Sequence, residues 1–99
     1  MFGGVLIGDR VTLSREVMIL TVGLDTSNYI ENANKQYRDH IVSSVEIEEG
    51  VWLGAKVLVL PGAHIAKNSI VAAGAVVVGD LSTEGCLYGG IPAKYIKNL

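Results

Sequence analysis

Aliphatic residues recur every six positions along most of this chain. They form two series: Met1, Ile7, Leu13 and Ile19, then Ile41, Ile47, Leu53, Val59, Ile65, Val71 and Val77. Because 49% of the residues are hydrophobic, such agreement would arise by chance in roughly one case in a thousand or fewer. A sustained period of six is typical of a repeat architecture.

A second set of positions lies four residues after each bulky one and holds mostly small or β-branched residues. Its members are Val5, Val11, Val17, Gly23, Val45, Val51, Val57, Ala63, Ser69, Ala75 and Leu81. This pattern suits a coil with three flat faces, in which each face takes one hexapeptide and the bulky residues stack inside, about 4.8 Å apart. The sequence therefore predicts an all-β protein, a parallel β-helix. Such coils usually wind left-handed, against the general rule for parallel crossovers.

The two series are out of phase, because Ile19 and Ile41 are not separated by a multiple of six. We therefore expect residues 25–40, which are largely polar, to leave the coil as a projecting loop. Such loops often hold binding residues, although a tolerated surface insertion is the alternative. The predicted organisation is one domain over residues 1–99: first coils 1–24, loop 25–40, remaining coils 41–82 and a C-terminal cap 83–99. A cap is expected because an open coil end leaves a sheet edge unpaired.

Charge and composition exclude several classes of function. The net charge is −2 and the basic residues are scattered apart from Lys94 and Lys97, which argues against nucleic-acid binding. No apolar run reaches the roughly 18 residues that span a bilayer, so no membrane partner is expected. The single cysteine, Cys86, is expected to be a small buried hydrophobe and favours a cytoplasmic location. A chain of 99 residues is marginal for building a core alone, which favours subunit association.

Three segments carry a resemblance to a known family. The stretch 45–60, VEIEEGVWLGAKVLVL, is followed by PGAHIAKNSIVAAGAVVV and later by GGIPAKYI. In this order they resemble the maltose, galactoside and related sugar O-acetyltransferases, which are hexapeptide-repeat acyltransferases with a left-handed β-helix. The resemblance implies a homotrimer that transfers an acetyl group from acetyl-CoA to a sugar hydroxyl, without a metal. Members have further N-terminal residues, so the chain resembles the C-terminal part of a longer enzyme or a shortened relative.

Small side chains mark the expected cofactor groove. Counting three faces along the two series places the hexads that begin at residues 1, 19, 53 and 71 on one face. Their third residues would then form a column of small side chains: Gly3, Thr21, Ala55 and Ala73. The resemblance implies that backbone groups at Ala55 and Ala73 bind the pantetheine arm of CoA. The alternative is that small residues merely fit the coil there.

Four further residues are implied by the same resemblance. Val78 stands at a CoA contact where the family often has threonine, so a hydroxyl contact would be lost. Lys94 and Lys97 stand where basic residues face the CoA phosphates, a role that suits cations; a solvated tail is the alternative. Trp52 is expected near the acceptor and the cofactor, or packed against a neighbouring subunit.

The histidine that the family uses as a general base is missing. Acetyl transfer to a hydroxyl needs a group that takes the proton, and neutral imidazole has a suitable pKa. The resemblance implies this histidine at Leu24, or at Val22 in some relatives. His40, at the end of the loop, is the better substitute of the two histidines, because His64 is expected to be a surface residue. Asp25 is expected to contact the acceptor and would be a weak base.

Three functional interpretations follow. The first is an acetyl-CoA-dependent O-acetyltransferase that uses His40, or a group outside this chain, as base. The second is a catalytically inactive relative that serves as a trimeric structural or binding module. The third is a zinc hydratase similar to the γ-class carbonic anhydrases, which need three histidines; two histidines in unsuitable places argue against it.

Overall fold

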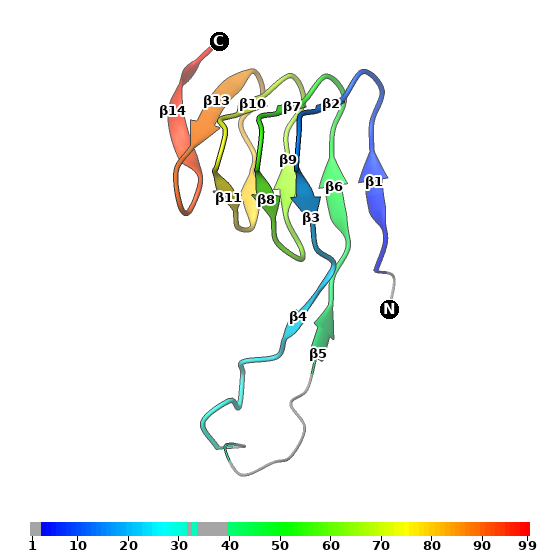
Figure 1. Cartoon of the computed structure of the whole chain (residues 1–99), viewed down its shortest axis with the longest axis vertical. Coiled ribbons are helices and arrows are strands. Elements are labelled where there is room, and N and C mark those ends of the chain that lie inside the picture. Colours follow the sequence, from blue (N-terminus) through cyan, green and yellow to red (C-terminus); the bar gives the residue numbers. More distant parts are fainter. Residues whose placement is uncertain (1–2, 32, 34–39) are drawn as a thin grey trace.

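The computed structural model describes residues 3–31, 33 and 40–99. In this part of the chain every regular element is a β-strand, and three parallel sheets wrap into a coil (Figure 1). Face A consists of β1 (Val5–Ile7), β6 (Val45–Ile47), β9 (His64–Ile65) and β12 (Asp80–Leu81). Face B consists of β2 (Thr12–Leu13), β7 (Trp52–Leu53), β10 (Ile70–Val71), β13 (Cys86–Gly89) and β14 (Lys94–Asn98). Face C consists of β3 (Met18–Ile19), β8 (Leu58–Val59) and β11 (Val76–Val77).

The chain visits the faces in the repeating order A, B, C, and neighbouring coils are held by parallel ladders. The bulky residues of the period align across these ladders as three interior columns. The columns are Ile7, Ile47, Ile65 and Leu81; Leu13, Leu53, Val71 and Tyr88; and Ile19, Val59 and Val77. From Ile47 to Val77 each member is at most 1% exposed. The six-residue period is therefore confirmed as the spacing of the interior.

The first coil is more open than the rest. Ile7 is 48% exposed and Leu13 is 45% exposed, although both occupy interior positions of their columns. In the described part of the chain, strands β1, β2 and β3 each have a neighbouring coil on one side only. Met1, the first member of the predicted series, lies outside the described residues.

Ile41 was assigned to the coil by its spacing, and this assignment is wrong. Two strands, β4 (Val22–Leu24) and β5 (His40–Val42), project from the coil as an antiparallel ribbon (Figure 1). In this ribbon Ile41 pairs with Gly23. The coil resumes at Val45, which pairs with Val5 on face A. The prediction counted a coil hexad that begins at Ile41. Because Ile41 lies in the ribbon, each hexad before the loop was assigned to the face next to its true one.

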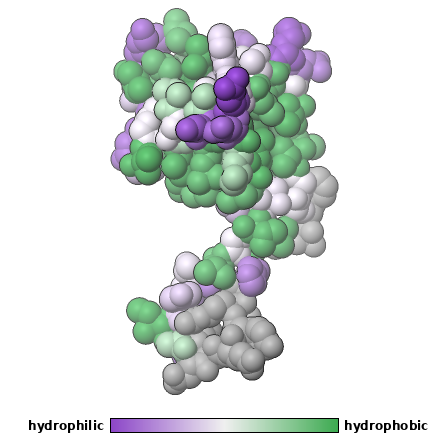
Figure 2. Space-filling model, in the orientation of Figure 1, coloured by the Kyte–Doolittle hydropathy of each residue, from purple (hydrophilic) through white to green (hydrophobic). Residues whose placement is uncertain are grey.

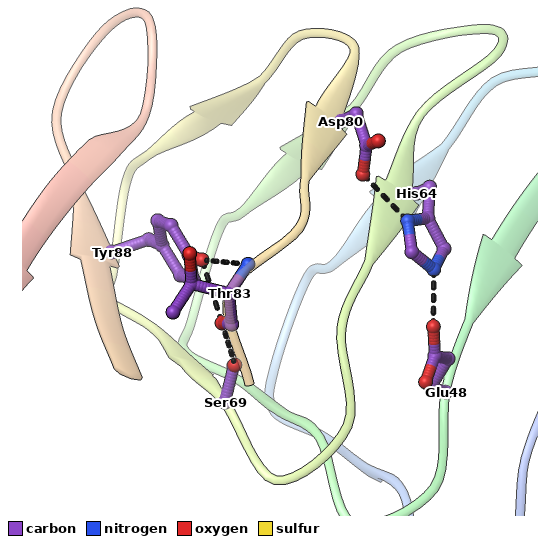
Figure 3. A network of polar contacts seen from close by, with 6 residues as sticks. All are labelled: Glu48, His64, Ser69, Asp80, Thr83 and Tyr88. Atoms are coloured by element: carbon purple, nitrogen blue, oxygen red, sulfur yellow. Dashed lines mark hydrogen bonds and ion pairs between the residues drawn. The ribbon is translucent and has the colours of Figure 1, made fainter. Parts of the chain in front are cut away.

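At the C-terminal end of the coil the interior columns continue, but the spacing between their residues changes. Leu81 occupies an interior position beside Ile65, only four residues after Val77, whereas the period had assigned it to a small-residue position. Tyr88 then fills the column above Val71, and its hydroxyl donates to the Thr83 carbonyl at 2.7 Å and accepts from the Thr83 amide at 3.0 Å (Figure 3). Strand β14 runs antiparallel to β13 and ends the face B sheet.

Candidate active site

The ribbon of β4 and β5 places a histidine beside the position where the base is missing. Leu24 is the direct cross-strand partner of His40, and Val22 is the partner of Val42. Opposed residues in an antiparallel ladder point to the same side, with Cβ atoms about 4.5–5.5 Å apart. Because side chains alternate along a strand, His40 and Leu24 share one side of the ribbon with Val22 and Val42. The sequence predicted His40 as the substitute base, but it could not reveal this register.

Asp25 follows Leu24 and forms a turn at the end of the ribbon. Its Oδ1 atom accepts the hydroxyl of Ser27 at 2.7 Å and the amide of Ser27 at 3.0 Å. These two hydrogen bonds, the hydroxyl contributing more, lower the pKa of the carboxyl group. Asp25 is therefore a poorer base than an ordinary aspartate, and its observed contacts hold the turn that follows β4.

A pocket of about 460 Å³ opens next to this turn. Its lining residues, which together define the ribbon pocket, are Leu24, Thr26, Ser27, Tyr29, Ile30 and Glu31. The sequence does not predict this pocket, because nothing in a polar, aperiodic segment indicates how its side chains fold against one another. Leu24 thus belongs both to the pocket wall and to the cross-strand pair with His40.

The predicted column of small residues is half correct. Ala55 and Ala73 do lie on adjacent coils, at the corner between faces B and C, where the Gly74 amide donates to the Ala55 carbonyl at 2.9 Å. The coils approach closely, since a Cβ atom at Gly54 would lie 2.7 Å from the backbone nitrogen of Ala73. In the first coil, however, this corner position is held by Arg15, whose carbonyl accepts the Lys56 amide.

Gly3 and Thr21 do not belong to this column, and their assignment to it is wrong. Thr21 lies at the base of the ribbon, where its carbonyl accepts the Ser43 amide, and Gly3 lies near both Thr21 and Val42. The error has the same cause as that for Ile41, because the ribbon takes residues that the hexad count had given to the coil.

The remaining predicted residues lie on different faces of one chain. Trp52 is half exposed on face B, where its indole nitrogen donates to the Ser14 hydroxyl at 3.0 Å. Lys94 and Lys97 lie exposed on β14, at the far edge of the same face. Val78 follows β11 and is 53% exposed at the edge of face C opposite the Ala55 corner. The structure therefore brings Ala55 and Ala73 together. It places Trp52 and the two lysines on face B and Val78 on face C.

His64 is held between two carboxylates on face A (Figure 3). Its Nδ1 atom lies 2.6 Å from Oδ1 of Asp80, and its Nε2 atom contacts Oε2 of Glu48. The hydrogen bond to Asp80, followed by that to Glu48, raises the pKa of the imidazole. Ionised carboxylates only accept hydrogen bonds, so the doubly protonated imidazolium satisfies both partners. With both nitrogens engaged, His64 is unsuited to act as the catalytic base.

The described residues hold no group of three histidine, cysteine, aspartate or glutamate side chains placed to bind a metal ion. Cys86 is buried, and its sulfur lies 3.4 Å from Oδ1 of Asn98. Within the same part of the chain, no helix is long and apolar enough to cross a membrane.

Comparisons with known proteins agree with this geometry. The family model described as bacterial transferase hexapeptide (six repeats) matches residues 44–79. A galactoside O-acetyltransferase of Lactococcus lactis subsp. lactis is 36% identical over 85 residues, which are 86% of this chain and 39% of that protein. The crystal structure of a maltose O-acetyltransferase from Clostridium difficile 630 is 30% identical, with a TM-score of 0.81 over 96% of this chain and 48% of the other.

A galactoside acetyltransferase in complex with coenzyme A is 26% identical, with a TM-score of 0.80 over 95% of this chain and 44% of the other. The chain thus spans less than half the length of each of these three relatives. The chain belongs to the hexapeptide-repeat acyltransferase family, and its fold is the left-handed parallel β-helix that the period and the resemblance predict.

The His64 bridge predicts a specific pH dependence of stability. Since the folded pKa is raised above the ordinary value of 6.5, the bridge contributes fully below that value and is lost as the pH rises through the folded pKa. We expect His64→Gln, which keeps a polar side chain but does not titrate, to lower the free energy of unfolding most at about pH 6. Denaturant unfolding should show this deficit shrinking toward about pH 9; an equal deficit at both pH values would contradict the prediction.

Proposed function

We propose that this chain is the cofactor-binding coil and part of the catalytic site of an acetyl-CoA-dependent O-acetyltransferase. The acceptor is a sugar or a similar molecule with a hydroxyl group. The observation that carries the proposal is the pairing of His40 with Leu24, which sets an imidazole beside the position where the family's base would stand. The activities of the galactoside and maltose O-acetyltransferases to which the chain is similar support the same class of reaction.

The residues at the corner between faces B and C fit a CoA molecule. Ala55 is half-buried and Ala73 is exposed, so their short side chains leave backbone groups accessible to a thin pantetheine arm. Lys94 and Lys97 provide cations for the phosphates at the edge of face B. Val78, at the opposite edge of face C, offers no hydroxyl to CoA, so the hydroxyl contact that the resemblance implies is absent. The donor, when bound, supplies a thioester carbonyl for attack by the acceptor.

His40 would act on the acceptor hydroxyl. Its neutral imidazole accepts the hydroxyl proton as the acceptor oxygen attacks the thioester, and it then returns this proton to the departing thiolate of CoA. A positioned general base contributes about 10²–10⁴-fold to such a reaction. The two hydrogen bonds that Asp25 accepts from Ser27 keep it ionised and make it a poor base, so it can favour the imidazolium that forms but cannot replace the imidazole as the base.

A second candidate function is that of a catalytically inactive trimeric module. It is favoured by the identity of Leu24 and Val22, which carry no titratable group at the two positions where the family's base is expected. In this case the coil would retain CoA binding or assembly without transfer.

Face C supports assembly into a homotrimer. Its outward positions on three successive coils are all aliphatic or Met: Met18, Leu20, Leu58, Leu60, Val76 and Val78. Figure 2 shows hydrophobic residues gathered over much of the coil. Face A, by contrast, presents Glu46, His64 and Asp80. An exposed apolar face of this kind marks a protein interface.

Such an interface would also complete the site. The predicted CoA positions lie on both borders of face C, with Ala55 and Ala73 on one and Val78 on the other, so a second copy packed here would bring opposite borders together. For the compartment we propose the cytoplasm, on the ground that a single cysteine favours a reducing environment.

The catalytic proposal predicts that His40 carries most of the chain's acetyl transfer. We expect slow transfer by the parent, a loss of about 10²-fold or more in His40→Ala, and a gain of at least tenfold in Leu24→His. Release of CoA from acetyl-CoA with a panel of sugars measures these rates. His64→Gln is the matched histidine control and should leave the rate unchanged. A parent rate that His40→Ala does not alter would contradict the role of His40; transfer only after Leu24→His would favour the inactive module.

The assembly proposal predicts three chains per particle in solution. Leu58→Asp places a charge at the centre of face C and should shift sedimentation toward the monomer, because burying an unpaired charge is costly. Ser82→Asp, on exposed polar face A, is the control and should remain assembled. A parent chain that sediments as a stable monomer at micromolar concentration would contradict the proposal.

A further inference from the structure

Trp52 is the single tryptophan of the chain, and a hydrogen bond ties it to the neighbouring coil. Its indole nitrogen donates to the Ser14 hydroxyl at 3.0 Å. Across the ladder between β7 and β2 the direct partner of Trp52 is Thr12, and Ser14 lies two residues beyond Thr12. With strands about 4.8 Å apart and a rise of about 3.3 Å per residue, such a diagonal neighbour lies roughly 8 Å away between Cα atoms. The indole therefore leans along its strand toward Ser14.

This lean brings the ring to the corner between faces B and C. Arg15, the residue after Ser14, holds this corner on the first coil, and Ala55 holds it on the second. Because Ser14 directly precedes Arg15, the N–H edge of the indole lies beside the corner that bears Ala55. This is the corner to which CoA is assigned.

The backbone fixes the position of the Ser14 hydroxyl. The Ser14 amide donates to the Leu53 carbonyl at 3.0 Å, and the carbonyl of the next residue, Arg15, accepts the Lys56 amide at 2.9 Å. Both hydrogen bonds tie this segment to the coil that carries Trp52. Ser14 is half-buried, whereas Trp52 is 52% exposed. The acceptor of the indole hydrogen bond is thus held firmly, while much of the ring remains accessible.

A fixed indole differs from a free one as a binding surface. A tryptophan side chain on the outward side of a sheet has two rotatable bonds, and a ligand that immobilises it must overcome the loss of this freedom. The hydrogen bond to Ser14 restricts the ring before a ligand arrives. The large apolar ring is then presented in one orientation, and covering it removes apolar surface from water.

We propose that Ser14 is a positioning residue for the acyl donor. Its hydroxyl holds the Trp52 indole beside the corner between faces B and C, where the ring forms one wall along the pantetheine arm of CoA. Trp52 contacts the arm, and Ser14 acts only through Trp52. The proposal rests on the proposed function for the identity of the ligand, whereas the coupling of Ser14 to Trp52 stands on the hydrogen bond between them.

Fluorescence of the single tryptophan tests the coupling without any ligand. Ser14→Ala removes the hydrogen-bond acceptor, so acrylamide should quench the indole more strongly and the emission maximum should shift. Ser14→Thr retains a hydroxyl at the same position and should restore the quenching of the parent. Thr12→Ala is the matched control, because it removes a hydroxyl directly across the ladder from Trp52 while the indole hydrogen bond to Ser14 is kept. Thermal unfolding verifies that each variant is folded.

Titration calorimetry with two probes tests the link to the donor. Acetyl-CoA contains the pantetheine arm, and adenosine 3′,5′-bisphosphate has the nucleotide end of CoA without the arm. We expect Ser14→Ala to weaken acetyl-CoA binding about threefold to tenfold, within the range that one hydrogen bond contributes, and to leave the affinity for the bisphosphate unchanged. Ser14→Thr and Thr12→Ala should bind both probes as the parent does.

A double-mutant cycle tests whether Ser14 acts through the indole N–H. Trp52→Phe keeps an aromatic ring but has no N–H to donate, so Ser14→Ala should cost no further affinity for acetyl-CoA in this background. Additive losses would show that Ser14 affects the donor independently of Trp52 and would overturn its positioning role.

The outcomes separate the role of Ser14 from the proposed function. Acetyl-CoA binding that Ser14→Ala leaves unchanged, or indole quenching that it does not alter, would overturn the role of Ser14 and leave the enzyme in place. An equal loss of affinity for acetyl-CoA and the bisphosphate would also overturn it, because the effect would then not concern the arm. A parent that binds no acetyl-CoA at millimolar concentration would contradict the proposed function and the role of Ser14 together.

Discussion

The stacking of side chains in three interior columns is the constraint on which this structure depends. Each bulky residue lies above its equivalent on the coil below, and from Ile47 to Val77 the chain uses six residues for each face. In these columns the fully buried residues Ile47, Leu53 and Val59 are followed on the next coil by Ile65, Val71 and Val77. A parallel ladder at about 4.8 Å brings these side chains into contact. Everything that binds must then be built on corners, outward positions or segments that leave the coil.

The same constraint explains which parts of the fold could be predicted. Between Val45 and Val77 the period is unbroken, and it located the interior from sequence alone. Ile41 misled the count because an aliphatic residue in a two-stranded ribbon has the same appearance as one in a coil, and only the register with Gly23 distinguishes them. At the other end, Leu81 and Tyr88 preserve the columns by changing the length of the corners, which a fixed period cannot anticipate.

The candidate site was less predictable, because it depends on side chains outside the period. Ala55 and Ala73 were placed correctly as neighbours, since both follow interior residues of face B at the same interval. The pairing of His40 with Leu24 depends on the register of the ribbon, and the ribbon pocket depends on how an aperiodic turn folds. His64 was expected to be a plain surface residue, yet two carboxylates on neighbouring strands hold it. Spacing reveals which side a residue occupies, but not which partners it meets across coils.

The proposed acetyl transfer depends on CoA binding at the corner between faces B and C. Amide chemical shifts of the 15N-labelled chain, recorded during titration with acetyl-CoA, test this binding residue by residue. The largest changes should occur at Ala55 and Ala73, with smaller ones at Lys94 and Lys97, while Glu46 on face A stays unchanged. Changes centred on face A, or none at millimolar acetyl-CoA, would contradict it.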